Sequence, residues 1–226
     1  MYKMITFDNI KSGKLSLDTT TVEDYDPILE EPSSRYTLTE LADIFGSDKG
    51  SIKHNYTNVY ENILSSLRFS HVRLVEVGIA CGASLKMWSN YFSNGEIIGA
   101  DINEDCKKLC SSYKNVEIRI KDATLETVAE QFDIFVDDGS HISKDILSTF
   151  NLHWAELKSG GWYFIEDLRC THNEEYKQQT VVQKPDEYFD RRYFLKLIDA
   201  ITKACDNRWD VAQIIYTPQL ISIKKA

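Results

Sequence analysis

Acidic side chains and one histidine directly follow two apolar stretches of the chain, in a pattern that can hold a metal ion. The two groups are Asp137-Asp138-Gly139-Ser140-His141 and Glu166-Asp167. If the apolar stretches are parallel strands of one sheet, their carboxyl ends share the edge where ligands bind. Crowded carboxylates repel one another unless a cation neutralises them, and oxygen ligands suit Mg²⁺. We therefore predict a divalent-metal site there, the alternative being solvated loop carboxylates that cap helices.

His141 is the candidate general base of this group. It lies three residues beyond Asp138, so that both side chains can address one substrate oxygen. Imidazoles titrate near neutral pH, which suits removal of a proton from a hydroxyl at cellular pH. A histidine at this position could instead cap a helix or pack against it, and without the neighbouring carboxylates we would favour that interpretation.

A glycine-containing turn between a strand and a helix forms the second candidate site. Its sequence is Val75-Glu76-Val77-Gly78-Ile79-Ala80-Cys81-Gly82-Ala83-Ser84. Glycines let the backbone approach a ligand closely, and free amides at a helix start favour polar groups. Asp101 ends the next apolar stretch, where a carboxylate can accept hydrogen bonds from both hydroxyls of an adenosine ribose. The alternative is a tight strand-to-helix turn with no ligand.

Asp122, in Lys121-Asp122-Ala123, follows the third apolar stretch. A carboxylate at that strand end could accept a hydrogen bond from the exocyclic amine of adenine. An aspartate that only caps a helix or closes a turn would look the same, and the sequence favours neither interpretation.

Strands and helices must alternate to position these groups. Apolar runs predict strands at 71–77, 96–101, 116–120, 132–136 and 161–165. Helical spacing predicts two helices at 37–46 and 55–68. It predicts three more by their apolar faces, which are formed by Leu85, Trp88 and Phe92, by Ile146, Phe150 and Trp154, and by Phe194, Leu197 and Ile201. This alternation predicts an α/β fold with a doubly wound, Rossmann-like sheet.

The end of the chain breaks this alternation. Only Thr217-Pro218-Gln219 separates the apolar runs 211–216 and 220–223, a gap too short for a parallel crossover. An antiparallel hairpin should therefore close the sheet, a pattern typical of class I methyltransferases rather than of dehydrogenases. We expect residues 1–35 to be an N-terminal arm or lid, 36–226 to be the catalytic domain, and 168–208 to be a lid over the second substrate.

Composition narrows the classes of protein and partner. The 226 residues suffice for one sizeable core, and the net charge of −9 argues against a nucleic-acid partner. Five cysteines without a CxxC pair suggest neither a disulfide framework nor a zinc site. No signal-peptide core or membrane-length apolar run occurs, so we expect a cytoplasmic protein without a membrane partner.

Together, these motifs resemble those of the metal-dependent sugar O-methyltransferases of macrolide tailoring and their relatives in polysaccharide biosynthesis. The resemblance spans about residues 37–170. It rests on Asp48-Lys49-Gly50, His54-x-Tyr56, Tyr60-Glu61, Glu76-Val77-Gly78, Gly82-Ala83-Ser84-Leu85-Lys86-Met87-Trp88, Asp137-Asp138-Gly139-Ser140-His141 and Gly160-Gly161-Trp162-Tyr163-Phe164-Ile165-Glu166-Asp167-Leu168.

This resemblance implies methyl transfer from S-adenosylmethionine to a sugar hydroxyl, with Mg²⁺ held by Asp138, Glu166 and Asp167 and with His141 as base. It also implies a small sugar or nucleotide-sugar acceptor and a homo-oligomer. The residues that we expect to contact the cofactor are Glu76, Gly78, Gly82, Ser84, Asp101, Asp122 and Asp137.

The chain departs from that family in the turn between Gly78 and Gly82, which is shorter than in the macrolide enzymes, and at Lys121, where a glycine is common. Residues 168–208 show no match, so the acceptor is open. A catechol-type O-methyltransferase and a non-catalytic nucleotide-binding protein remain the alternatives, and a dehydrogenase is the weakest because of the terminal hairpin.

Overall fold

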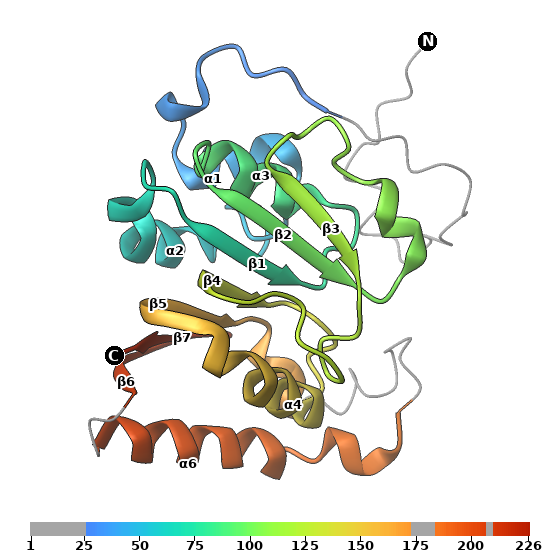
Figure 1. Cartoon of the computed structure of the whole chain (residues 1–226), viewed down its shortest axis with the longest axis vertical. Coiled ribbons are helices and arrows are strands. Elements are labelled where there is room, and N and C mark those ends of the chain that lie inside the picture. Colours follow the sequence, from blue (N-terminus) through green and yellow to red (C-terminus); the bar gives the residue numbers. More distant parts are fainter. Residues whose placement is uncertain (1–25, 173–183, 207–209) are drawn as a thin grey trace.

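Seven strands form one sheet in the computed structural model, which describes residues 26–172, 184–206 and 210–226 (Figure 1). The strands are β1 (Arg73–Val77), β2 (Glu96–Asp101), β3 (Val116–Ile120), β4 (Phe132–Asp137), β5 (Leu157–Ile165), β6 (Val211–Thr217) and β7 (Leu220–Lys225). Their order across the sheet is β3-β2-β1-β4-β5-β7-β6. The order reverses between β1 and β4, and open α/β sheets bind ligands at such a reversal.

Strands β1 to β5 pair in parallel, and the chain then changes direction. β7 runs antiparallel to β5, and β6 pairs with β7 as an antiparallel hairpin. This confirms the predicted fold class, a mostly parallel sheet with an antiparallel C-terminal hairpin. The predicted strands agree with the observed ones to within two residues at each end, except that β5 starts at Leu157 instead of 161. A register shift in its pairing with β4 lets the strand include Gly160 and the residues before it.

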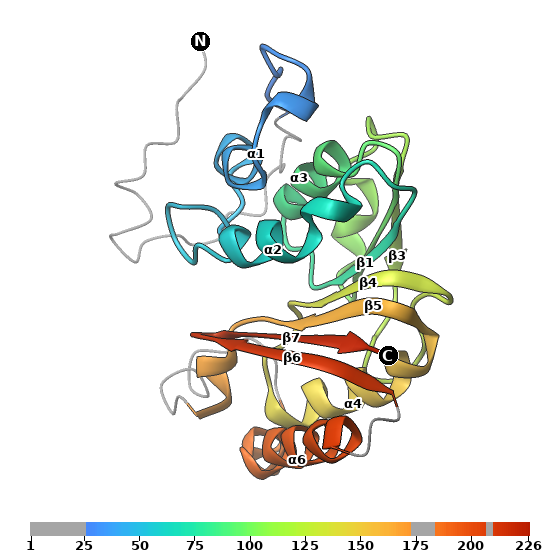
Figure 2. The same ribbon diagram turned by 90° about the vertical axis from the view of Figure 1, so that its left-hand side faces the viewer.

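Helices cover both faces of the sheet. On one face lie α1 (Leu38–Phe45), α2 (Thr57–Leu64) and α3 (Ala83–Tyr91), and on the other lie α4 (Ser143–His153) and α6 (Arg192–Asp206) (Figures 1 and 2). Short 3₁₀ helices are η2 (Ser33–Arg35), η3 (Ser65–Leu67), η4 (Glu104–Lys108), η5 (Trp154–Glu156), η6 (Leu168–His172) and η7 (Asp186–Phe189). Trp154, predicted on the same helix as Phe150, begins η5 instead.

The core divides into two apolar layers because side chains alternate along each strand. Leu74 and Ile97 pack with α1, α2 and α3, whereas their neighbours Val75 and Ile98 pack with α4 and α6. Glu76 faces the first of these layers, where its side chain is fully buried at the centre of the sheet. A buried carboxylate is costly without a partner, so its surroundings bear on the site.

The first helix ends in a way that returns the chain to the sheet. Thr37 and Glu40 form a capping box at the start of α1, and Gly46 ends the helix with a left-handed φ of 72°. The Ser47 amide then donates to the Ala42 carbonyl at 2.8 Å. Since left-handed backbone favours glycine, this sequence directs residues 47–56 toward the carboxyl ends of the strands.

Parts of two predicted segments lie outside the described residues. These are 1–25 of the expected N-terminal arm, and 173–183 and 207–208 of the expected lid. Among the residues described, no helix combines the length and apolar character needed to span a membrane.

Candidate functional site

The ends of β1, β4 and β5 lie side by side and bring the predicted site residues together. The Asp138 amide donates to the Val77 carbonyl at 3.0 Å, and the Glu166 amide donates to the Asp137 carbonyl at 3.0 Å. The strand ladders thus continue to the first acidic residue after each strand. This fixes the backbone of Asp138 and Glu166 at neighbouring positions on the ligand-binding edge.

Gly78 allows the chain to leave β1 close to β4. Its φ is +81°, and a Cβ atom there would lie 2.1 Å from the Asp138 carbonyl oxygen. A side chain is therefore excluded both by backbone conformation and by space. The glycine of the predicted turn is therefore needed for the close approach to the chain that leaves β4, and its contact with a cofactor stays a prediction.

Asp138, His141 and Asp167 form a cluster whose ligand atoms all lie within 4.8 Å of one another. His141 Nε2 is 3.9 Å from Asp138 Oδ1 and 3.7 Å from Asp167 Oδ2. All three side chains are partly exposed to solvent. The two carboxylates offer oxygen ligands, which suit a hard divalent cation such as Mg²⁺, so Asp138 and Asp167 fit the predicted metal. The His141 imidazole lies beside them, where the sequence places the candidate base.

Two members of this cluster have unusual backbone conformations. His141 has a φ of +56° and Asp167 a φ of +53°, although neither is glycine. Such residues carry a conformational cost that the surrounding structure must offset, and they gather at functional sites. At Asp167 the left-handed turn sends its side chain into the cluster, whereas the preceding Glu166 side chain is buried.

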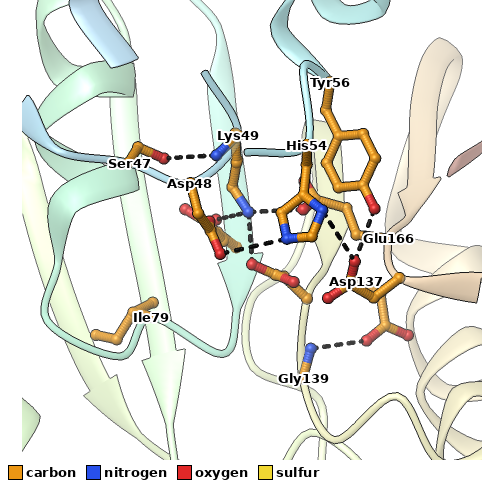
Figure 3. Close-up of polar contacts among 12 residues, drawn as sticks. Ser47, Asp48, Lys49, His54, Tyr56, Ile79, Asp137, Gly139 and Glu166 are labelled. Atoms are coloured by element: carbon orange, nitrogen blue, oxygen red, sulfur yellow. Dashed lines mark hydrogen bonds and ion pairs between the residues drawn. The ribbon is translucent and has the colours of Figure 1, made fainter. Parts of the chain in front are cut away.

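Glu166, the third predicted metal ligand, lies beside this cluster and is held by other protein groups. Its Oε2 accepts a hydrogen bond of 2.8 Å from the Lys49 ammonium, and its Oε1 accepts one from the Tyr60 hydroxyl. Figure 3 shows the Lys49 side chain pointing at Glu166 from the loop after α1. The role of Glu166 as a metal ligand stays a prediction.

Lys49 contacts three carboxylates at once. Its Nζ atom lies 2.5 Å from Asp138 Oδ2, 2.8 Å from Glu166 Oε2 and 3.2 Å from Glu76 Oε1. Only 1% of the Lys49 side chain is exposed. The buried Glu76 thus has a cation for a partner, and the same cation reaches the ends of β4 and β5.

Burial and these ion pairs oppose each other in their effects on pKa. Burial alone would lower the pKa of Lys49, but the carboxylates of Asp138, Glu166 and Glu76 outweigh it and raise that pKa well above its usual range. Burial raises the pKa of Glu76 to about 7 although the Lys49 charge opposes this. Burial and the nearby Asp138 charge also raise the pKa of Glu166.

The same loop supports Asp167. The Tyr56 hydroxyl donates a 2.7 Å hydrogen bond to Asp167 Oδ1, and His54 Nδ1 lies 3.9 Å from the same oxygen. The His54 and Tyr56 rings are stacked, with centroids 5.0 Å apart (Figure 3). Burial lowers the pKa of His54, which favours its neutral form beside Asp167.

Two adjoining cavities surround the glycine turn. The first is lined by Asp101, Asp122 and Asp137, and the second by Ser84, Asp138 and Asp167. Both are also lined by Gly78, Asp101, Gly139 and His141. The space lined by Asp101, Asp122 and Asp137 therefore adjoins the space at the carboxylate cluster.

The predicted cofactor residues differ in what they do. Asp101 accepts hydrogen bonds from the amides of Ile79 and Asn103, at 3.1 and 2.9 Å, and so holds the glycine turn while lining both cavities. Asp122 accepts from the Thr124 amide and hydroxyl. It thus closes a turn, as the alternative interpretation expects, and it also lines the first cavity. Its contact with the adenine amine stays a prediction.

Three further predicted residues lie deeper. Asp137 lines the first cavity but is 5% exposed, and burial raises its pKa to about 7. Glu76 and Gly82 line neither cavity. Glu76 pairs with Lys49. Gly82 caps the start of α3 with a φ of +78° and packs against the turn after η4, where an added Cβ would lie 3.0 Å from Cys110 Sγ.

Sequence reasoning assigned no role to Lys49, His54, Tyr56 or Tyr60, although all four belong to the motifs that carry the family resemblance. One signal was available: carboxylates gathered at one edge require positive charge. A lysine in a turn such as Ser47-Asp48-Lys49-Gly50 can supply it as well as a metal ion can.

Comparison with known proteins agrees with this geometry. No family model matches the chain. Over 141 residues it is 36% identical to the L-olivosyl-oleandolide 3-O-methyltransferase of Streptomyces antibioticus, covering 58% of this chain and 36% of that enzyme. Over 147 residues it is 30% identical to the mycinamicin VI 2''-O-methyltransferase of Micromonospora griseorubida, covering 60% and 37%. The chain thus matches little more than a third of the length of these curated relatives.

Solved structures give the same result for the fold. The MycE methyltransferase of the mycinamycin biosynthetic pathway, in complex with Mg, SAH and mycinamycin VI, superposes with a TM-score of 0.70 and 25% identity, over 86% of this chain and 56% of that one. The SAH-bound Podospora anserina methyltransferase PaMTH1 shares the fold, with a TM-score of 0.56 and 13% identity over the full length of both chains. The chain therefore has the class I methyltransferase fold, and its resemblance to the sugar O-methyltransferases is confirmed over about three fifths of its length.

Proposed function

We propose that this chain transfers a methyl group from S-adenosylmethionine to a hydroxyl of a sugar or sugar-containing small molecule. One observation carries the proposal: the cavity at the glycine turn and Asp101 opens onto the cluster of Asp138, His141 and Asp167. A methyl donor and an acceptor hydroxyl could therefore meet at this strand edge. The relatives' names support a sugar as the acceptor.

The residues that would hold the cofactor lie around Gly78 and Asp101. Asp101 fixes the turn through the Ile79 amide, so that the backbone at Gly78 remains open to a ligand. Carboxylates lining the cavity suit a cationic donor, because opposite charges attract strongly where water is largely excluded. S-adenosylmethionine would supply the methyl group, and the protein would place it in line with the acceptor oxygen.

Asp138 and Asp167, with Glu166 as the predicted third ligand, would hold a divalent cation. Such a cation would make the proton of an acceptor hydroxyl easier to remove. Lys49 leaves Asp138 Oδ1 directed toward His141, since it engages the other oxygen of that carboxylate. Tyr56 orients Asp167 in a similar way.

His141 is the proposed base. Its Nε2 atom lies between the carboxylates of Asp138 and Asp167, where an acceptor hydroxyl held by the cation would come within reach. The proton would pass from the acceptor oxygen to His141 as that oxygen takes the methyl group. The predicted cytoplasmic location and homo-oligomeric state stay predictions.

The test is methyl transfer with defined components. The chain would be incubated with S-adenosylmethionine carrying a radiolabelled methyl group, Mg²⁺ and a panel of nucleotide-sugars, glycosylated macrolides and catechols. We expect label on a sugar-containing acceptor, loss of transfer with EDTA and recovery with added Mg²⁺.

Three outcomes would contradict parts of the proposal. Full activity in metal-free protein would remove the cation from the reaction. Transfer to catechols alone would replace the sugar by a phenol. Absence of S-adenosylhomocysteine binding in calorimetry would refute the cofactor assignment and leave a protein that only shares the fold.

A further inference from the structure

Lys49 is the one ammonium in the described structure that joins the cofactor turn to the carboxylate cluster. It contacts Glu76 on β1, Asp138 after β4 and Glu166 after β5. Three neighbouring strands thus meet at one buried atom. Lysines are almost never fully buried unless they are paired. The three carboxylates therefore neutralise the buried ammonium, and the ammonium in turn neutralises part of their charge.

The loop that carries Lys49 is itself fixed by backbone hydrogen bonds. The Thr57 amide donates to the Lys49 carbonyl at 3.1 Å, and the Asn55 amide donates to the Gly50 carbonyl at 2.8 Å. Asp43 of α1 accepts from the Ser51 amide and hydroxyl, at 2.9 and 2.6 Å. The ammonium is therefore held from a closed loop, and its position does not depend on the carboxylates alone.

Asp138 shows what this contact can do. Lys49 engages Oδ2 at 2.5 Å, which leaves Oδ1 as the oxygen that faces His141 at 3.9 Å. The ammonium thus helps to fix which oxygen of Asp138 faces the cluster. Groups that orient a metal ligand from behind commonly change metal affinity when they are replaced.

We propose that Lys49 is a positioning residue that holds Asp138 and Glu166 ready for a divalent cation and ties them to Glu76 below the cofactor turn. This inference rests on the proposed function. Lys49 touches neither of the two side chains, His141 and Asp167, that complete the cluster with Asp138, so it would act through Asp138 and Glu166. Its positive charge opposes cation binding, so any favourable effect must come from geometry.

The experiment separates geometry from charge. The variants are compared above the pKa of Glu76, which is about 7, so that this carboxylate is ionised in the wild type. In the double variant Lys49→Met/Glu76→Gln, one positive and one negative charge are then lost, so the net charge of the buried cluster is unchanged. Methionine fills much of the space of the lysine stem, and glutamine preserves the shape of Glu76. Mn²⁺ affinity would be measured by electron paramagnetic resonance without cofactor or acceptor, and folding by circular dichroism.

We expect the double variant to fold and to bind Mn²⁺ about 10–100-fold more weakly than the wild type. Lys49→Arg is the second variant, because it keeps the charge but replaces the compact ammonium by a planar guanidinium. It should also weaken Mn²⁺ binding. The control is Lys53→Met, which removes an exposed lysine of the same loop that pairs with Asp48 and should leave Mn²⁺ affinity within twofold of the wild type.

A folded double variant with wild-type Mn²⁺ affinity would overturn the inference. So would failure of both Lys49 variants to fold, because the lysine would then serve the fold rather than the site. If the wild-type chain bound no Mn²⁺, the proposed metal site itself would fall and this role with it. Wild-type binding together with unchanged Lys49 variants would refute only the role of Lys49.

Discussion

Replacement of Gly78 by alanine should damage both stability and the site, and Gly160 provides a matched comparison. Both glycines have left-handed φ angles, +81° and +78°. An added Cβ at Gly160 meets nothing within 4 Å, whereas one at Gly78 would lie 2.1 Å from the Asp138 carbonyl oxygen and 2.8 Å from Gly139 Cα. The pair therefore separates the cost of the backbone conformation from the cost of the clash.

The expected magnitudes follow from these two terms. Left-handed backbone costs a non-glycine residue about 1–2 kcal/mol, and the stiffer unfolded chain returns about 0.4–1 kcal/mol. Gly160→Ala should thus lower the free energy of unfolding by about 1 kcal/mol. At Gly78 the clash is with backbone that must move, and overpacking adds about 1–3 kcal/mol, so Gly78→Ala should lose about 2–4 kcal/mol.

Urea unfolding followed by circular dichroism would give both free energies, and calorimetry would give the affinity for S-adenosylhomocysteine. Gly78→Ala should also weaken Mn²⁺ binding, because the displaced carbonyl belongs to Asp138. Gly160→Ala should leave both ligand affinities unchanged. Equal losses of stability in the two variants would refute the clash, and unchanged ligand binding in Gly78→Ala would refute the link between this glycine and the site.

Two further predictions concern histidines. His141→Ala should lower the single-turnover methyl-transfer rate by about 10²–10⁴-fold, as expected for loss of a general base, while cofactor binding survives; near-wild-type rates in His141→Asn or His141→Gln would leave positioning as its role. His153 is fully buried, and its Nε2 accepts from the Val128 amide while Nδ1 lies 2.7 Å from the Thr149 carbonyl. Burial lowers the pKa of His153 in the folded state. The neutral imidazole therefore stabilises the folded protein above the unfolded-state pKa of about 6.5. This contribution to the free energy of unfolding is lost as pH falls, by at most about 1.4 kcal/mol per pH unit. Urea titrations between pH 7.5 and 5 should show this loss in the wild type and in the exposed-site control His71→Gln but not in His153→Gln, and identical pH dependence in all three would contradict it.

Local pattern explains why the fold could be predicted. Strands β1 to β4 follow short apolar runs, and the gap between β6 and β7 is too short for anything but a hairpin. The extension of β5 to Leu157 could not be read from the sequence, because Lys158-Ser159-Gly160 looks like a turn. Only the bulged pairing with β4 continues that strand.

The site residues that directly follow strands could be predicted from the sequence, whereas those that packing brings to the site from a distant loop were missed. Asp138 and Asp167 each follow a strand, so the rule for parallel sheets brings them together. Lys49 lies 89 positions before Asp138 and 117 before Glu166, in a polar loop that resembles solvated surface. Glu166 and Asp167 are adjacent in sequence, and only the backbone turn at Asp167 separates a buried carboxylate from one that faces the cluster.

Three sharp turns at the ends of β1, β4 and β5 explain how one edge can hold so many functional groups. Gly78, His141 and Asp167 all have left-handed φ angles, and each follows one of three neighbouring strands. Extended strands would carry their side chains apart, to alternate faces of the sheet. A left-handed residue near each end breaks that alternation, so that groups from three strands can face one cavity. Two of these residues are not glycine and carry a conformational cost. Tyr56 holds one of them, Asp167, by a hydrogen bond, and Lys49 holds the neighbouring Asp138 and Glu166, both from outside the sheet. The loop after α1 is therefore as much a part of the site as the strands are.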